Sequence, residues 1–357
     1  MFILADDLGY GDVGYNGGTP NTPRLDSLAA SDVLLTDCYA GAPHCSPSRA
    51  AFLTGRCSTR VGFYNIVNSD YIHLRLFEVT IAELLREAGY HTGIFGKWHL
   101  GTFIASHPTV DDLGFDYSFI TPGNADPTHE NPTSFIRNGV AVGSTNGYAC
   151  QLVVSEAIEV LDTYKPGEPF FHFLSFHEPH KQWAAPPDLK ANYSTYTEDE
   201  QKYYGCIENM DSAIGRYLDA LETRGLTQNT IVIFTSDNGP IPPEGSQSSG
   251  PLREQKTNLY DGGLKVPGLV RWPGTLSTRT ITQPVGIVDW LPTLCAAVGI
   301  EAPTDRVLDG VNVWPLLQGR CRGSPVNDPC SGFSTMRRGM STTPLPPSVT
   351  ASTHGSP

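Results

Sequence analysis

The sequence predicts an α/β fold with a largely parallel central sheet and helices on both of its faces. Two observations support this prediction. Short apolar runs with the length of strands alternate with longer segments that have the periodicity of amphipathic helices. Several of the apolar runs also end directly in charged or amide residues, as strands do where they open into functional loops. Repeated strand–helix units favour parallel pairing, because each helix returns the chain to the same edge of the sheet.

The strands are predicted from continuous apolar runs, since a parallel sheet that is covered on both faces buries both sides of each strand. Between residues 101 and 150 the periodic signals are few, and we expect a long loop region there that contributes to a functional site. In chain order, the predicted strands cover residues 3–5, 90–95, 171–176 and 231–235.

Five helices are predicted from apolar stripes and from signals at their ends. Gly89 suits the C-terminal end of the second helix. Thr197 and Glu200 form a capping box that opens the fourth. Pro292 lies inside the last helix, so we expect that helix to kink or to start late. In chain order, the predicted helices cover residues 23–30, 80–88, 152–164, 197–225 and 287–298.

The composition disfavours two classes of protein. The chain has 357 residues, which is enough for one large domain or for a large domain with a small one. Its formal net charge of −13 argues against a nucleic-acid-binding protein, which normally carries a basic face. No apolar run approaches the roughly 20 residues of a membrane span. An anionic substrate would have to find a local cluster of positive charge on this acidic protein.

Two of the predicted strands carry oxygen ligands at their carboxyl ends. Asp6 and Asp7 follow the first strand, and Asp237 and Asn238 follow the strand over residues 231–235. Ligands gather at the carboxyl ends of strands in open α/β sheets, and Ca²⁺ and Mg²⁺ prefer carboxylate and amide oxygens. Each segment alone could be a solvated acidic loop, but the two together indicate a divalent-cation site.

The most informative segment is residues 45–56, with the sequence CSPSRAAFLTGR. The pattern places Cys45 at the N-terminus of a helix, where unpaired amides and the helix dipole favour negative charge. Arg49 follows on the first helical turn. A lone Cys-x-Pro would more often mark a buried structural cysteine. The full run, together with the acidic motifs on either side of it, resembles the type I sulfatase family, in which a separate enzyme oxidises this cysteine to formylglycine.

The resemblance implies an alkaline-phosphatase-like fold and a metal site at the carboxyl edge of its sheet. The family usually carries Ca²⁺ at this place, and Mg²⁺ is the alternative. The residues that the resemblance assigns to the metal are Asp6, Asp7, Cys45 in its modified form, Asp237 and Asn238.

The resemblance also implies a pocket for the sulfate group. Lys97 and His99 are two residues apart, so an extended backbone would point both to the same side. In the segment after residues 171–176, the family pattern favours His180 over His177, and we expect His172 to be structural. The residues that the resemblance assigns to the reaction are Cys45, Arg49, Lys97, His99, His180 and Lys256, and of these Lys97, His180 and Lys256 would bind the substrate.

The reaction that the resemblance implies begins with the hydrated formylglycine, whose oxygen attacks sulfur and expels the alcohol. Sulfate is then eliminated and the aldehyde returns. His99 would be the base of that elimination, Arg49 would orient the nucleophile, and His180 or Lys256 would protonate the leaving oxygen. The substrate would be a sulfated sugar or an aryl sulfate, and the formylglycine-generating enzyme would be a partner during maturation.

Two alternatives stay open at this point. A metal-dependent phosphatase or phosphodiesterase shares the fold, although such enzymes usually offer Ser or Thr as the nucleophile, and Cys45 counts against them. The chain could also be an inactive, truncated fragment that retains the motifs.

The two ends of the chain depart from the family pattern. The resemblance covers about residues 1–318, which we take as the catalytic domain. Sulfatases usually continue into a small antiparallel C-terminal domain, whereas residues 319–357 are rich in Ser, Thr, Pro and Gly and predict a disordered tail, so we expect that domain to be truncated. Met1 lies inside the first strand, and we expect the natural start and any signal peptide to lie upstream.

The family implies a lysosomal, extracellular or periplasmic location. The glycosylation sequon at residues 192–194 is compatible with a secretory route. The chain has eight cysteines and no CxxC pair, which makes a zinc module improbable on sequence grounds. We assign no disulfide.

Overall fold

The computed structural model describes residues 1–104 and 106–320. Its strands form a sheet of 10 strands in the order β12-β2-β11-β9-β1-β8-β4-β5-β6-β7 and a sheet of three in the order β10-β3-β13. The strands are β1 (Phe2–Ala5), β2 (Val33–Leu35), β3 (Cys38–Tyr39), β4 (His91–Lys97), β5 (Tyr117–Thr121), β6 (Ile136–Arg137), β7 (Val140–Ala141), β8 (Phe170–Ser175), β9 (Val232–Ser236), β10 (Lys265–Val266), β11 (Gly268–Arg271), β12 (Arg279–Ile281) and β13 (Val285–Gly286).

The centre of the large sheet is parallel, as predicted. Strands β9, β1, β8, β4 and β5 all run in the same direction. Strand β11 is antiparallel to both of its neighbours, β9 and β2, and the short strands β6 and β7 extend the opposite edge in antiparallel fashion. The active-site candidates therefore follow strands whose carboxyl ends lie on one edge.

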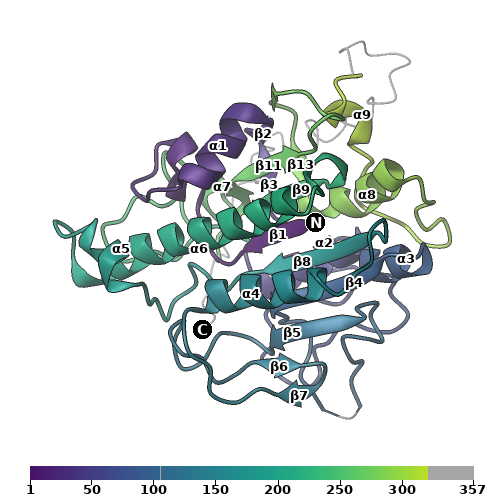
Figure 1. Cartoon of the computed structure of the whole chain (residues 1–357), viewed down its shortest axis with the longest axis horizontal. Helices are drawn as coiled ribbons and strands as arrows, with labels where there is room; N and C mark the ends of the chain where they lie inside the picture. Colours follow the sequence, from purple (N-terminus) through teal and green to yellow (C-terminus); the bar gives the residue numbers. More distant parts are fainter. Residues whose placement is uncertain (105, 321–357) are drawn as a thin grey trace, which may run out of the picture.

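Helices cover both faces of the large sheet (Figure 1). The core on one face contains side chains of α2, α3 and α8. The core on the other face contains side chains of α1, α4 and α6, and in the figure α4 and α6 lie in front of the sheet. The helices are α1 (Pro23–Ser31), α2 (Cys45–Thr54), α3 (Ile81–Glu87), α4 (Ala149–Leu161), α5 (Pro187–Ala191), α6 (Glu198–Thr223), α7 (Asp261–Leu264), α8 (Trp290–Val298) and α9 (Trp314–Leu317), with short 3-10 turns η1 (Tyr10–Asp12), η2 (Gly14–Asn16), η3 (Thr227–Asn229) and η4 (Ile287–Asp289).

Strand β1 shows why an unbroken apolar run suits the middle of this sheet. All four of its residues are buried. Phe2 and Leu4 belong to the core beneath α2, whereas Ile3 and Ala5 belong to the core beneath α6. The Phe2 ring stacks on Phe52 of α2, with ring centroids 3.8 Å apart. The same strand thus ties both helical layers to the sheet.

The predicted helices are present, with shifted ends. Helix α6 begins after the capping box of Thr197, whose side chain accepts a hydrogen bond from the Glu200 amide. Helix α4 starts three residues before the predicted 152 and ends at Leu161. In the segment 287–298 the regular helix starts late, as predicted, because the 3-10 turn η4 precedes α8. Pro292 falls in the first turn of α8, where its missing N–H costs little.

The prediction of a loop region over residues 101–150 was incomplete. Strand β5 pairs in parallel with β4 over five residue pairs, and β6 and β7 follow it. Single-sequence periodicity missed β5 because its polar and apolar residues do not alternate regularly. Of the predicted tail, residues 321–357 lie outside the described part of the chain. No helix among the described residues is long and apolar enough to cross a membrane.

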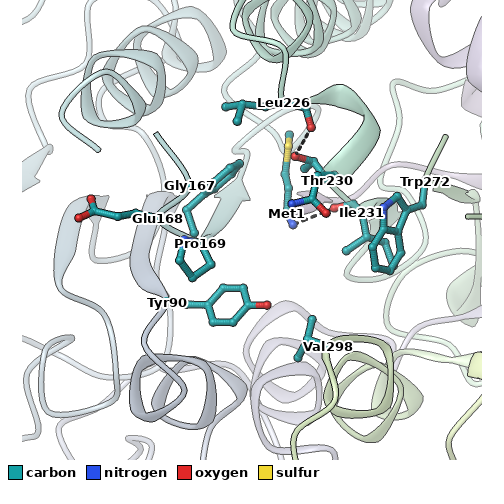
Figure 2. A pocket seen from close by; sticks show the side chains of 12 residues that line it. Met1, Tyr90, Gly167, Glu168, Pro169, Leu226, Thr230, Ile231, Trp272 and Val298 are labelled. Carbon is teal, nitrogen blue, oxygen red and sulfur yellow. Dashed lines mark hydrogen bonds between the residues drawn. The ribbon is translucent and has the colours of Figure 1, made fainter. Parts of the chain in front are cut away.

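A cavity of about 240 Å³ lies at the amino ends of the central strands (Figure 2). Met1, Tyr90 and Ile231 line it just before β1, β4 and β9, and Trp272 and Val298 close it on one side. Its lining is largely apolar, with Glu168 as the one carboxylate among the described residues that line it. The polar candidates of the sequence lie at the other end of the sheet.

His172 lies within β8, as expected for a structural residue. It is fully buried, and its ring nitrogens bond the hydroxyls of Tyr217 at 2.6 Å and Tyr164 at 3.1 Å. Burial lowers the pKa of His172 to about 3. Below pH 6.5 this histidine is therefore protonated in the unfolded chain but stays neutral in the folded chain. The free energy of unfolding consequently falls as the pH drops.

We predict that His172→Gln flattens this pH dependence. The titration of His172 should cost roughly 2 kcal/mol of unfolding free energy at pH 5 relative to pH 7, and the variant lacks it. Urea unfolding at both pH values measures the difference. His172→Asn, a second variant that removes the buried imidazole, should show the same flattened dependence. Equal slopes in all three proteins would contradict the prediction.

Candidate active site

Three buried carboxylates meet at the carboxyl edge of the sheet. Asp6 and Asp7 follow β1, and Asp237 follows β9, which pairs with β1 in parallel register. The Asp7 amide donates to Asp237 Oδ1 at 3.2 Å. Asn238 lies next to them, and its Nδ2 donates to Asp7 Oδ1 at 2.7 Å. The structure therefore brings together all four residues that the sequence placed at the ends of two strands.

Cys45 is the first residue of α2, and its sulfur lies against these carboxylates. The Sγ atom is 3.4 Å from Asp6 Oδ1 and 3.8 Å from Asp7 Oδ1, and it accepts a hydrogen bond from Lys256 Nζ at 3.1 Å. The side chain is 1% exposed. Burial and the charge of Asp6 raise the pKa of the thiol, so Cys45 is protonated at neutral pH.

Arg49 lies one turn further along α2, on the same face as Cys45. Its Nε and Nη2 both reach Asp237 Oδ2 at 2.8 Å, and Nη2 lies 3.8 Å from Asp6. Its Nη1 donates to the carbonyl of Lys97 at 3.1 Å and to the Ser175 hydroxyl. This buried guanidinium therefore connects α2 with the ends of β1, β9, β4 and β8.

Two lysines complete the charge balance. Lys97, the last residue of β4, pairs with Asp6 at 2.5 Å, and Lys256 pairs with Asp7 at 2.5 Å. Burial alone would lower the pKa of each ammonium, but the neighbouring carboxylates outweigh it and raise the pKa of both lysines. Both ammonium groups are therefore charged at neutral pH, close to the sulfur of Cys45.

The histidines differ in their surroundings. His180 Nε2 lies 3.7 Å from Asp7, while His177 is fully buried and bonds the Thr121 hydroxyl at 2.7 Å. His99 has a φ of 57°, so the extended backbone predicted for Lys97 to His99 ends before His99. Its Nδ1 is buried without a hydrogen-bond partner among the described residues. Burial and the charge of Lys97 hold the pKa of His99 well below its usual range.

The carboxylates also respond to this environment. Burial raises the pKa of Asp6 by itself, but the attraction of Lys97, His180 and Arg49 outweighs it and holds the pKa well below the usual range. For Asp237, burial and the charge of Asp6 dominate and raise the pKa to about 7. The three carboxylates thus face three buried cations, and their pKa values move in different directions because each is placed differently relative to those cations.

Comparison with known proteins assigns this chain to a protein family. The sequence profile of the family described as Sulfatase matches residues 1–300. The chain belongs to the sulfatase family. It is therefore a sulfuric ester hydrolase by descent, and its α/β architecture is that of the family.

Relatives with curated names agree with the assignment. The sulfatase is 32% identical to human N-acetylgalactosamine-6-sulfatase over 91% of this chain and 67% of that relative. It is 34% identical to human arylsulfatase A over 89% of this chain and 67% of that relative. Among solved structures, Ps i-CgsB in complex with k-i-k-neocarrahexaose superposes with a TM-score of 0.81 at 30% identity, covering 88% of this chain and 74% of the other.

The donor set of the sulfatase fits a divalent cation. Ligand atoms of Asp6, Asp7, Cys45 and Asp237 lie within 4.8 Å of one another. The Asn238 Oδ1 atom is buried without a hydrogen-bond partner among the described residues, which is costly unless something binds it. Carboxylate and amide oxygens are the ligands of Ca²⁺ and Mg²⁺. Asp6, Asp7, Asp237 and Asn238 can therefore hold such an ion.

Sequence reasoning missed two polar residues of the site. Ser175 ends β8, and its hydroxyl donates to the Lys97 carbonyl at 2.6 Å. Asn124, in the loop after β5, accepts a hydrogen bond from Lys97 Nζ at 3.2 Å. A polar residue at the end of an apolar run was a usable signal for Ser175. Asn124 had no such signal, because the loop around it carries no periodic pattern.

We predict that Arg49→Gln destabilises the protein by about 3 to 5 kcal/mol, because it leaves the buried Asp237 carboxylate without its cation. Urea unfolding at pH 7 measures the loss. Arg86→Gln breaks an exposed pair with Asp111 and should cost no more than about 1 kcal/mol. Similar losses in the two variants would show that the buried pair is not what holds this edge together.

Proposed function

We propose that this sulfatase hydrolyses sulfate monoesters of carbohydrates through a formylglycine formed from Cys45, with a bound Ca²⁺, or Mg²⁺ in its place. The position of Cys45 carries this proposal. Its sulfur lies at the N-terminus of α2, within 3.8 Å of Asp6 and Asp7 and 3.1 Å from Lys256 Nζ. This is the point where a nucleophile would meet both the metal carboxylates and the cations for a sulfate group.

The protein's own residues have properties that suit the reaction. The modified side chain would supply an oxygen nucleophile, and a bound cation would neutralise charge on the sulfate oxygens. Arg49 holds Asp237 and so fixes the carboxylates. Lys97 and Lys256 are charged and buried, and they would bind sulfate oxygens more strongly there than in water.

Proton transfer is assigned to three side chains. The low pKa of His99 leaves it neutral at pH 7. Its Nδ1 atom has no hydrogen-bond partner in the described part of the chain and could accept a proton as sulfate is eliminated. Lys256 is protonated and touches the nucleophile position, so it can donate a proton to the leaving oxygen. His180, beside Asp7, is the second candidate donor.

A carbohydrate is the substrate class that the comparisons favour. The human relative is named for N-acetylgalactosamine 6-sulfate, and the solved structure of Ps i-CgsB contains a neocarrahexaose. An aryl sulfate would serve as a small test substrate. We further propose maturation by a formylglycine-generating enzyme on a secretory or periplasmic route, for which the exposed Asn192 of the sequon is suited.

A phosphatase or phosphodiesterase activity is less well supported. The phosphonate monoester hydrolase of Agrobacterium radiobacter shares the fold, with a TM-score of 0.64 at 21% identity, and this likeness concerns the fold alone. An inactive fragment is the other alternative. Both alternatives predict no turnover of sulfate esters, so one activity measurement separates them from the proposal.

We predict that Cys45→Ala abolishes turnover of 4-nitrophenyl sulfate without loss of folded protein. The protein should be expressed together with a formylglycine-generating enzyme, and mass spectrometry of the peptide that contains position 45 should show the aldehyde. Cys57→Ala, at an exposed cysteine, is the control and should keep full activity. Activity of the Cys45→Ala protein equal to that of the wild type would overturn the proposed nucleophile.

We predict that chelation of divalent cations removes the activity and that added Ca²⁺ restores it. Asp7→Asn should lower the Ca²⁺ content found by elemental analysis, because it removes a buried carboxylate of the donor set. Asp162→Asn, at an exposed carboxylate, should leave the content unchanged. Zn²⁺ bound in place of Ca²⁺ would instead indicate the alternative group of Asp7, Cys45 and His180.

A further inference from the structure

A polar cavity of about 590 Å³ lies beside the loop that follows Asp7, and none of the residues of the catalytic cluster lines it. We call it the Asp12 cavity. Its walls come from residues 11–20, from the start of α6 and from residues 245–251. The first segment continues the loop that begins with Asp7, and the last leads into Lys256. The cavity and the catalytic cluster therefore share two segments at the same end of the sheet.

Two buried side chains in the cavity wall have hydrogen-bonding capacity to spare. Asp12 is 1% exposed, and both of its hydrogen bonds, from the Gly9 amide and the Tyr203 hydroxyl, fall on Oδ2. The Ser248 hydroxyl also lies within reach of Asp12 and of Tyr203. Ser248 is 2% exposed, and its Oγ has no partner of acceptable geometry in the described part of the chain. A bound hydroxyl group could donate to Asp12 and accept from Ser248 in place of this poorly aligned contact between the two side chains.

Aromatic rings form another part of the wall. Tyr196 and Tyr204 line the cavity with ring centroids 5.2 Å apart and planes at 81°. Tyr204 is buried, whereas Tyr196 is 40% exposed. Glu200 and Gln247 add planar polar groups to the lining. A ligand with apolar C–H faces and many hydroxyl groups would match rings beside hydrogen-bonding groups.

The charge of the cavity is opposite to that of a sulfate site. Among the described residues that line it there is no Lys, Arg or His, while Asp12 and Glu200 are acidic. An anionic sulfate group would be repelled there and attracted to Lys97 and Lys256 instead. The neutral parts of a sulfated carbohydrate would meet no such repulsion.

We propose that the Asp12 cavity binds an unsulfated sugar residue of the carbohydrate whose sulfate ester is hydrolysed at the catalytic cluster. The inference rests on the proposed function for the substrate class. The volume lies within the range of about 300 to 1,000 Å³ that is common for small-molecule sites. The cavity would hold a neighbouring residue of the chain and so favour oligosaccharides over small sulfate esters.

Binding of neutral oligosaccharides tests the inference without any turnover. The probes are unsulfated di- and tetrasaccharides that contain galactose or N-acetylgalactosamine, titrated into the full chain and followed by NMR. We expect binding that inorganic sulfate does not displace. Tyr196→Ala should weaken it roughly three- to tenfold, the loss expected for one aromatic contact. Tyr90→Ala, in the cavity of Figure 2, is the matched control and should bind like the wild type.

Turnover of 4-nitrophenyl sulfate separates the two proposals. None of the residues assigned to the reaction lines the Asp12 cavity, so Tyr196→Ala should hydrolyse this substrate at the rate of the wild type. A wild-type protein that hydrolyses it but binds none of the neutral probes would overturn the inference alone. Equal probe binding by Tyr196→Ala, or displacement of the probes by sulfate, would also overturn it. Probe binding without any sulfatase activity would overturn the proposed function alone.

Discussion

Three carboxylates are buried together at one edge of the sheet, and the rest of the site depends on how their charge is compensated. Taking an isolated carboxylate out of water costs several kcal/mol, even after the protein relaxes around it. Each carboxylate here has a cation from a different element: Asp6 pairs with Lys97, Asp7 with Lys256 and Asp237 with Arg49. These ion pairs therefore hold together the ends of β1, β9 and β4, the start of α2 and the loop that contains Lys256.

In the proposed function, the same cations would also bind the anionic sulfate group. The protein carries a net charge of −13, yet its buried cations are concentrated around one sulfur atom. A divalent ion on the carboxylates would share them with the lysines and free the ammonium groups to bind substrate oxygens. Because the cations are fixed before the substrate arrives, little reorganisation is needed as charge develops in the reaction. Under the proposal, the charges that stabilise this edge of the sheet are also those that would act in the reaction.

Much of the site could be predicted from the sequence, partly from local rules and partly from the family resemblance that assigned the residues their roles. Asp6 and Asp237 follow adjacent parallel strands, and Cys45 and Arg49 lie one turn apart on a helix. The helical spacing of Cys45 and Arg49 is a local relation, whereas the adjacency of β1 and β9 is a property of the whole sheet. Asn124 could not be found, since it reaches Lys97 from a loop without a periodic pattern. The left-handed conformation of His99 was likewise hidden, because tertiary contacts determine it.

The sheet likewise has strands that could be predicted from local sequence and strands that could not. Strands β1, β4, β8 and β9 of the parallel centre were visible as apolar runs, whereas β5 was missed. Strands β6 and β7 have two residues each and are defined only by pairing with β5 and with each other. Strand β11 reads as apolar, but nothing local reveals that it runs antiparallel to β9. Direction and order depend on contacts between segments that are far apart in the sequence.

A crystal structure of the matured protein with Ca²⁺ and inorganic sulfate would test the central claim most directly. The account predicts one cation bound by Asp6, Asp7, Asp237 and Asn238, an oxygen-bearing side chain at position 45 in place of the thiol, and sulfate oxygens beside Lys97 and Lys256. An unmodified Cys45 in fully active protein, or a cation bound away from these carboxylates, would contradict it.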